Sequence, residues 1–214
     1  MNKGDQIAYF EGLLAEHGES YKALDWNSVE SQRLRFQILK ELFIYGRKSS
    51  GLTLLDVGCG FGDWYGFLKA EGLLRRHRIT YTGYDISPKI VAVAKKKYPD
   101  ADLSVKDILE DRYIKKYDYV ICSGVFNIRT TDTEAHLDFV KEMMARLYDL
   151  AAFGVGMNFL SEGAFLSAGS TDLNNGRYFY FKPEEIISYC RFLGARFIMR
   201  HDYHPGDFTV YLLK

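Results

Sequence analysis

An apolar run that ends in an acidic residue and a glycine-rich turn occupies residues 54–63, which read Leu54-Leu55-Asp56-Val57-Gly58-Cys59-Gly60-Phe61-Gly62-Asp63. A strand followed by such a turn and a helix is typical of nucleotide-binding sheets. A dinucleotide fingerprint requires a third glycine where this chain has Asp63. A carboxylate at a helix N-terminus repels a phosphate, whereas it can accept a hydrogen bond from an ammonium group. The segment therefore predicts a nucleoside-like ligand that is partly cationic.

Three later segments also combine a predicted strand with polar or glycine residues at its end. Residues 79–85 alternate β-branched and aromatic residues and end in Asp85, which is followed by a helix start at Ile86-Ser87-Pro88. Residues 101–105 precede Lys106-Asp107-Ile108, and the buried run 117–123 ends in Ser123-Gly124. Because the carboxyl ends of parallel strands border one crevice, we expect these turns to line a single site.

Taken in order, these four segments resemble the motifs of the class I S-adenosylmethionine-dependent methyltransferases. The resemblance implies S-adenosylmethionine as the cofactor, with Asp85 accepting hydrogen bonds from both ribose hydroxyls, which suits the two oxygens of a carboxylate. It also implies that Asp107 accepts from the adenine amine and that Ile108 packs against the base. The cofactor-binding residues expected in these segments are Asp56, Gly58, Cys59, Gly60, Gly62, Asp63, Asp85, Ile86, Asp107, Ile108, Ser123 and Gly124. For each of the three strand-end acids, Asp56, Asp85 and Asp107, a helix cap or turn residue is the alternative interpretation.

The periodicities predict an α/β fold with a doubly wound, seven-stranded, mostly parallel sheet, which is also the Rossmann-like fold of that family. Helices are expected near residues 3–17, 28–46, 63–74, 87–98, 133–149 and 183–193, and strands near 52–57, 79–84, 101–105, 117–123, 151–159, 196–203 and 207–213. A tight turn at residues 204–207 can join only antiparallel neighbours, so the last strand is expected to run in reverse. We expect one domain over residues 1–214, with a helical prefix or lid at 1–50, a cofactor-binding core at 51–214 and a substrate loop at 160–182.

The prefix offers one candidate ligand for the cofactor. Ser28 is a plausible N-cap, and the helix that follows carries Leu34 and Ile38 on its apolar face. In many relatives such a helix closes over the cofactor, and an arginine there suits the methionyl carboxylate. We therefore expect Arg35 to bind that carboxylate, with a solvated basic face as the alternative.

The acceptor and its base are less sharply indicated. The hairpin after the sixth strand should lie on the ligand side, so His201 and His204 are the candidate bases, with a local hydrogen-bonding role as the alternative. Candidate substrate residues are Asn127, Asp172, Tyr178 and Tyr180. For the run Tyr178-Phe179-Tyr180-Phe181, the simpler interpretation directs the two phenylalanines into the core and the two tyrosines outward. No metal is expected.

Composition limits the classes of partner. Lysine and arginine together number 28, as do aspartate and glutamate, so the overall field does not favour nucleic acid or an anionic membrane. The three cysteines lack zinc-ligand spacing, and no segment is apolar over the roughly 20 residues of a spanning helix. We therefore expect a cytoplasmic enzyme that methylates an oxygen or nitrogen of a small molecule, and the sequence does not indicate its oligomeric state. The alternatives are an RNA or protein methyltransferase, a non-catalytic cofactor-binding domain and, more distantly, an NAD-dependent oxidoreductase.

Overall fold

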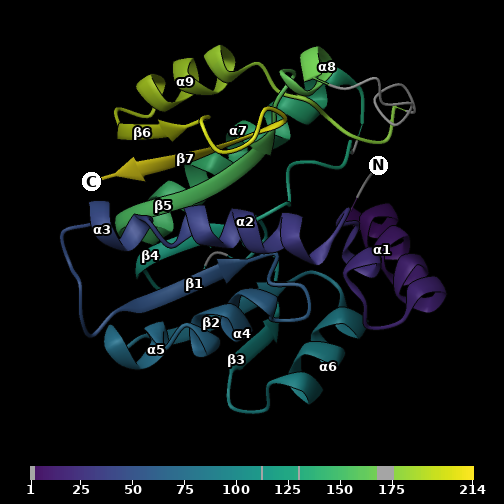
Figure 1. Ribbon diagram of the computed structural model, residues 1–214, viewed down its shortest axis with the longest axis vertical. Helices are drawn as coiled ribbons and strands as arrows, with labels where there is room; N and C mark the ends of the chain where they lie inside the picture. The colour runs from purple at the N-terminus through teal and green to yellow at the C-terminus, as the bar shows by residue number, and fades with distance from the viewer. Residues whose placement is uncertain (1–2, 112, 130, 168–175) are drawn as a thin grey trace.

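The computed structural model describes residues 3–111, 113–129, 131–167 and 176–214 of the chain. In these residues a seven-stranded sheet has the order β3-β2-β1-β4-β5-β7-β6, with helices on both of its faces (Figure 1). Six strands are parallel and β7 pairs antiparallel with both β5 and β6, which confirms the predicted fold. The strands are β1 (Thr53–Val57), β2 (Thr80–Asp85), β3 (Asp102–Val105), β4 (Tyr117–Cys122), β5 (Ala151–Leu160), β6 (Arg196–Arg200) and β7 (Asp207–Leu213).

The helices follow the predicted order, but two of them are divided. The segment expected to be one helix at 28–46 forms two, because the chain makes a tight turn at Lys40 and Glu41, where the Glu41 amide donates to the Ile38 carbonyl at 2.9 Å. The segment at 63–74 is interrupted by Gly72, which has a φ of +67°. The helices are α1 (Lys3–His17), η1 (Tyr21–Leu24), α2 (Val29–Leu39), α3 (Leu42–Tyr45), α4 (Asp63–Ala70), α5 (Leu73–Arg76), α6 (Pro88–Lys97), α7 (Thr133–Leu150), α8 (Ala164–Ser167) and α9 (Pro183–Phe192).

Both faces of the sheet are buried, which is why its central strands are almost continuously apolar. On one face, Leu55 and Val120 pack with Leu147 of α7 and with Ile186 and Cys190 of α9. The opposite face packs against the helices that precede and follow β1, through Leu54, Tyr119, Ile121, Leu39 of α2 and Trp64 of α4. The strands are thereby fixed in register, and the carboxyl ends of the six parallel strands form one edge of the sheet.

A buried ion pair fixes α2 to this sheet. Arg35, only 5% exposed, donates through Nε to Asp207 at 3.2 Å and also through Nη2, while its Nη1 donates to the Ser31 carbonyl at 2.8 Å. Asp207 begins β7 and is 1% exposed. Burial raises the pKa of the Asp207 carboxyl, and the Arg35 charge opposes that rise. Both charges are largely removed from bulk water, so each is stabilised mainly by the other.

Removing one partner of this pair should destabilise the protein strongly. We expect Arg35→Leu to lower the free energy of unfolding by about 3–5 kcal/mol, because it leaves the Asp207 charge buried without its partner. The double substitution Arg35→Leu with Asp207→Leu should recover much of that loss. Urea denaturation at pH 7 measures both effects.

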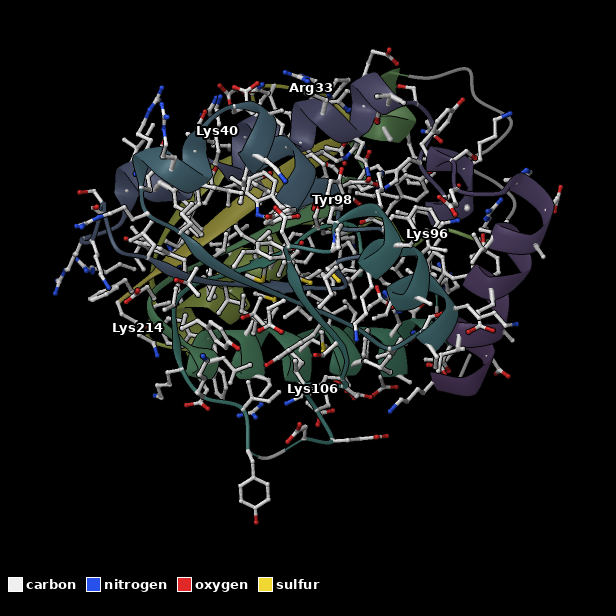
Figure 2. The ribbon with its side chains drawn as sticks, turned by 90° about the horizontal axis from the view of Figure 1, so that it is seen from below. Arg33, Lys40, Lys96, Tyr98, Lys106 and Lys214 are labelled. Carbon is white, nitrogen blue, oxygen red and sulfur yellow. The ribbon has the colours of Figure 1, made fainter. Side chains whose placement is uncertain are left out.

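Arg33 supplies a matched control on the same helix. Its side chain is 57% exposed at the surface of the protein (Figure 2). It forms an ion pair with Glu71 at 2.8 Å. Because exposed ion pairs contribute little, Arg33→Leu should cost about 1 kcal/mol or less. Equal losses from the Arg33 and Arg35 substitutions would contradict a stabilising role for the buried pair.

Candidate active site

A cavity of about 650 Å³ opens at the carboxyl ends of the parallel strands, a size typical of small-molecule sites. The turns after β1, β2, β3 and β4 line it, together with residues of α1 and α2. In Figure 1 the arrowhead of β1 points toward the side where α1 lies, and β7 points the opposite way. The sheet topology therefore collects four strand-end turns beneath the N-terminal helices.

Most residues predicted for the site lie on the wall of this cavity. Those that line it are Arg35, Asp56, Gly58, Cys59, Gly60, Asp63, Asp85, Ile86, Asp107, Ile108, Ser123, Gly124, Asn127, Tyr178 and Tyr180. Gly62, His201 and His204 are absent from the wall that the described residues form. Asp172 lies outside the described residues. The structure therefore brings together the strand-end motifs, whereas it leaves the predicted bases outside.

The glycine turn is shaped by close approach and by positive backbone angles. Gly58 has a φ of +72°, and a Cβ atom there would lie 2.2 Å from Val125 Cγ2. The Gly58 and Cys59 amides donate to the Tyr84 carbonyl at 2.8 and 3.0 Å, which holds the turn against the end of β2. Gly62, with a φ of +76°, is the residue before α4 and contributes to the start of that helix. A side chain at Gly58 would occupy space that the turn needs.

Two carboxylates stand near the ends of β1 and β2, Asp56 buried and Asp85 half-buried. Asp56, 2% exposed, accepts a hydrogen bond from the Tyr81 hydroxyl at 2.6 Å. Asp85 accepts from the backbone amides of Gly60 and Ser87, each at 3.0 Å. Burial raises the pKa of both carboxyls, and in Asp56, where the Asp85 charge adds to the effect, the pKa reaches about 7. No lysine or arginine in the described chain pairs with either carboxylate, so the pair suits a cationic ligand.

Asp63 lies on the same wall but already has partners. Its carboxylate accepts from Lys97 Nζ at 2.6 Å and from Gln32 Nε2 at 3.2 Å. Lys97 lies at the end of α6, so Asp63 connects α4 with both α6 and α2. The helix N-terminus after the glycine turn thus carries a carboxylate, as the sequence indicated, and its charge is partly compensated.

The adenine end predicted from the motifs is covered by α1. Asp107 accepts from the Leu109 amide at 2.9 Å and forms an ion pair with Lys3 Nζ at 2.9 Å. Glu11, also on α1, accepts from Ser87 Oγ at 3.0 Å. The residues of α1 that line the cavity are Lys3, Gln6, Ile7 and Phe10. Sequence reasoning missed this contribution, although the spacing of Ile7, Phe10 and Leu14 is that of an apolar helix face.

The structure does not support the role predicted for Arg35. Its guanidinium reaches the cavity wall, but the donors that would hold a cofactor carboxylate are engaged by Asp207 and Ser31. The Trp26 ring lies over it, 5.1 Å from the ring centre to the guanidinium carbon. Asp207 follows Arg35 by 172 residues in the chain, so no local pattern could indicate this pairing. Arg35 therefore joins α2 to β7.

Residues 177–181 form the roof of the cavity between the turn after β4 and the end of β5. Tyr178 forms an antiparallel bridge with Ile128, and Phe181 a parallel bridge with Ser161. Phe179 and Phe181 are buried in the core, whereas Tyr178 and Tyr180 line the cavity, so the predicted alternation is confirmed. The roof thus presents tyrosine side chains to the site.

Hydrogen bonds to Asp25 connect this roof to the N-terminal helices. Its carboxylate accepts hydrogen bonds from the Tyr9 hydroxyl at 3.0 Å, from Arg177 Nη2 and from the Tyr178 hydroxyl at 3.2 Å. Asp25 has a φ of +59°, an uncommon angle for a residue other than glycine. One carboxylate therefore joins α1, the turn after η1 and the roof.

Several polar groups at the turn after β4 are buried within the cavity wall or behind it. The Gly124 amide donates to Asn158 Oδ1 at 3.0 Å, and the Leu160 amide donates to Asn127 Oδ1 at 3.1 Å. On the wall itself, Ser123 Oγ and Trp64 Nε1 are buried without a hydrogen-bond partner in the described protein. Unpaired buried polar atoms are costly, so these two groups indicate that a polar ligand completes the site.

The histidines predicted as bases lie away from the cavity. The hairpin after β6 lies on the same side of the sheet as the other strand-end turns, as predicted. However, β6 is the outermost strand of the sheet, so His201 and His204 are exposed to solvent away from the cavity. His204 Nδ1 accepts from the Gly206 amide at 3.0 Å and lies 3.3 Å from Asp207. His136, on α7, is fully buried beside the Phe126 carbonyl. None of the five histidines lines the part of the cavity wall that the described residues form, so this geometry gives no support to a histidine base, which stays a prediction.

The high pKa of Asp56 predicts a pH-dependent difference between the protein and its Asp56→Asn variant. A carboxyl whose pKa is higher in the folded than in the unfolded state stabilises the fold at low pH and loses that contribution as the pH rises through about 7. The asparagine variant cannot ionise there. Relative to the parent, we expect its unfolding free energy to rise by about 2 kcal/mol between pH 5 and pH 8, measured by urea denaturation. A constant difference across that range would contradict the burial of an ionisable Asp56.

Comparison with known proteins finds a methyltransferase domain within the chain. Residues 55–148 match the family described as a methyltransferase domain. A Mycobacterium tuberculosis protein named as a methyltransferase, Rv1506c, is 29% identical over 167 residues, which are 76% of this chain and 93% of that protein. Among the described helices, none is long and apolar enough to cross a bilayer.

Solved structures share the fold at low sequence identity. The magnesium protoporphyrin IX methyltransferase of Synechocystis PCC 6803, determined with S-adenosylmethionine bound, has a TM-score of 0.67 at 20% identity and covers 99% of this chain and 96% of its own. The plantazolicin methyltransferase BamL has a TM-score of 0.66 at 15% identity, over 99% of this chain and 97% of its own. Residues 55–148 therefore carry a methyltransferase domain, and the solved structures share the fold that gathers the four strand-end motifs at one cavity.

Proposed function

We propose that the enzyme methylates an oxygen or nitrogen atom of a small molecule. The observation that carries this proposal is a single cavity that continues from the cofactor turns to a wall of Trp26, Tyr178 and Tyr180. A cavity of about 650 Å³ that is partly roofed suits a cofactor and a compact acceptor side by side. The names of two structural neighbours refer to a magnesium protoporphyrin and to plantazolicin, and these neighbours support small acceptors as a class.

The residues on the cavity wall fit the cofactor. The buried carboxylates of Asp56 and Asp85 suit its positive charge and its sugar hydroxyls, and the unpaired Ser123 Oγ and Trp64 Nε1 offer further hydrogen bonds. We expect Asp85 to hold the ribose, Asp107 to accept from the adenine amine, and Ile86 and Ile108 to pack against the base. When bound, S-adenosylmethionine would supply a methyl carbon on a sulfonium; an acceptor lone pair would bond to that carbon, and the carbon–sulfur electron pair would leave with the sulfur.

The protein's own contribution to the reaction is mainly positioning. We expect an acceptor to lie between the roof tyrosines Tyr178 and Tyr180 and the turn at Gly124. Asn158 Oδ1 fixes that turn by accepting a hydrogen bond from the Gly124 amide. Holding two reactants in the right orientation can lower the activation barrier of a displacement substantially, without an acid or a base. No histidine on the described wall is available for proton transfer, so we propose that the acceptor proton leaves to solvent or to a wall carboxylate.

Cofactor binding gives the first test of this assignment. We expect S-adenosylmethionine and S-adenosylhomocysteine to bind the protein in calorimetry, and Asp85→Asn to weaken both by at least about tenfold, because it removes a charge-assisted acceptor from the ribose. Asp138→Asn is the control, since Asp138 is an exposed residue of α7 that does not line the cavity. Equal affinities of the two variants would contradict the role of Asp85.

Acceptor class is tested by following the methyl group. The protein is incubated with methyl-labelled cofactor and either a metabolite extract, total RNA or a protein extract. We expect the label in a small molecule. Label confined to RNA, with binding that weakens steeply as salt is added, would favour a nucleic-acid methyltransferase. Cofactor binding without label in any fraction would favour a non-catalytic binding domain.

A further inference from the structure

Three aromatic side chains from two separate segments line the acceptor side of the cavity. Trp26 follows η1, and Tyr178 and Tyr180 lie on the roof. The Trp26 ring is close to the turn after β4, because a Cβ atom on Gly124 would lie 3.2 Å from it. Tyr180 is held from behind by Phe165 of α8, with ring centres 4.8 Å apart. The rings therefore approach the turn that follows β4 from two directions.

The arginines near these rings are not available to an anionic acceptor. Arg35 is neutralised by Asp207 and lies under the Trp26 ring. Arg177 is neutralised by Asp25 and lies between the rings of Tyr9 and Tyr178, 5.3 and 5.4 Å from their centres. Each guanidinium thus supports an aromatic ring from behind, and Arg177 does not line the cavity at all.

The carboxylate at this end of the cavity is similarly engaged. Asp25 lines the cavity, but its oxygens accept from Tyr9, Arg177 and Tyr178. The Tyr178 hydroxyl is consequently turned toward Asp25, which leaves the body of its ring as the surface that a neighbouring ligand meets. Burial raises the pKa of the Tyr178 hydroxyl, so it stays uncharged at neutral pH.

The lysines on the cavity wall lie at the opposite, adenine end. Lys3 pairs with Asp107 and Glu110, and Lys106 pairs with Asp111. Within the described wall, therefore, no cation at the acceptor end is left for a phosphate or carboxylate. What remains there is aromatic surface together with Leu160 and the uncharged amide side chains of Asn27 and Asn127.

From this arrangement we infer that the acceptor is an uncharged aromatic or heteroaromatic molecule whose ring packs against Trp26, Tyr178 and Tyr180. The inference rests on the proposed function and narrows its substrate class. Aromatic pairs gain energy beyond their buried area through stacked or edge-on contacts, whereas an anionic acceptor would meet no free cation. A saturated molecule of equal size would lose the ring contacts.

The test compares three probes of similar size on the protein saturated with S-adenosylhomocysteine. The probes are 2-naphthol, decahydro-2-naphthol and 2-naphthoate, which represent a neutral aromatic, a neutral saturated and an anionic aromatic molecule. We expect calorimetry or saturation-transfer NMR to show 2-naphthol binding at least about fivefold more tightly than either of the others. Equal affinities, tighter binding of 2-naphthoate, or no binding of 2-naphthol at millimolar concentration would overturn the inference.

Variants locate the binding on the proposed wall. Tyr180→Leu and Trp26→Leu should each weaken 2-naphthol about 3- to 10-fold. Tyr113→Leu should leave it unchanged, because Tyr113 is 96% exposed on the segment before β4. Retention of full affinity in both wall variants would place the probe elsewhere and overturn the assignment.

Affinity for S-adenosylhomocysteine separates this inference from the proposed function. A protein that fails to bind S-adenosylhomocysteine contradicts the proposed function, and the acceptor assignment falls with it. A protein that binds S-adenosylhomocysteine but does not distinguish the three probes keeps the proposed function and loses only the aromatic acceptor. Wall variants that still bind S-adenosylhomocysteine are folded, so their loss of 2-naphthol reports on the wall itself.

Discussion

Two carboxylates that the sheet topology brings to one cavity, Asp56 buried and Asp85 half-buried, are the constraint on which the site depends. β1 and β2 are parallel neighbours, so their terminal acids Asp56 and Asp85 emerge at the same edge, and the Gly60 amide bonds the second of them across the glycine turn. No described lysine or arginine pairs with either acid. Burial without a counter-ion raises the pKa of both carboxyls, which makes a cationic ligand the natural partner of the site. The same acids, with Asp63 beside them, make it unfavourable for a pyrophosphate.

The N-terminal segment divides into two parts that are held to the domain by different forces. α2 is fixed by the buried Arg35–Asp207 pair and by apolar packing of Leu39 against the sheet. α1 has no fully buried residue, and its polar contacts reach the cofactor turns themselves, through Lys3 on Asp107 and through Glu11 on Ser87 and Lys89. The attachment of α1 therefore depends on exposed or half-buried polar contacts at the cavity, whereas that of α2 depends on a buried ion pair and on apolar packing.

The sequence was most informative where the physical signal is local. Strand-end acids, the glycine turn and the alternation from Tyr178 to Phe181 could be predicted, because each depends on neighbouring residues and on the two-residue period of extended chain. Long-range pairing could not. Arg35 looked available because its partner Asp207 lies at the far end of the chain, and His201 and His204 looked central because the sequence gives the direction of β6 but not its distance from the cavity. The contribution of α1 to the cavity wall could not be predicted for the same reason, since Lys3 contacts Asp107 only in the folded chain.

Charge is distributed unevenly along the cavity, and this asymmetry separates the selection of the cofactor from that of the acceptor. At the ends of β1 and β2 the carboxylates are buried without cations, so an incoming positive charge gains energy there. At the acceptor end, by contrast, the charges of Asp25 and Arg177 cancel, as do those of Asp207 and Arg35, and each guanidinium lies against an aromatic ring. Paired charges exert a weak field at a distance, so little electrostatic preference remains at that end. On the proposed function, ring shape and contact area would then decide which molecule stays beside the Gly124 turn, while Asp56 and Asp85 would select the cofactor by its charge.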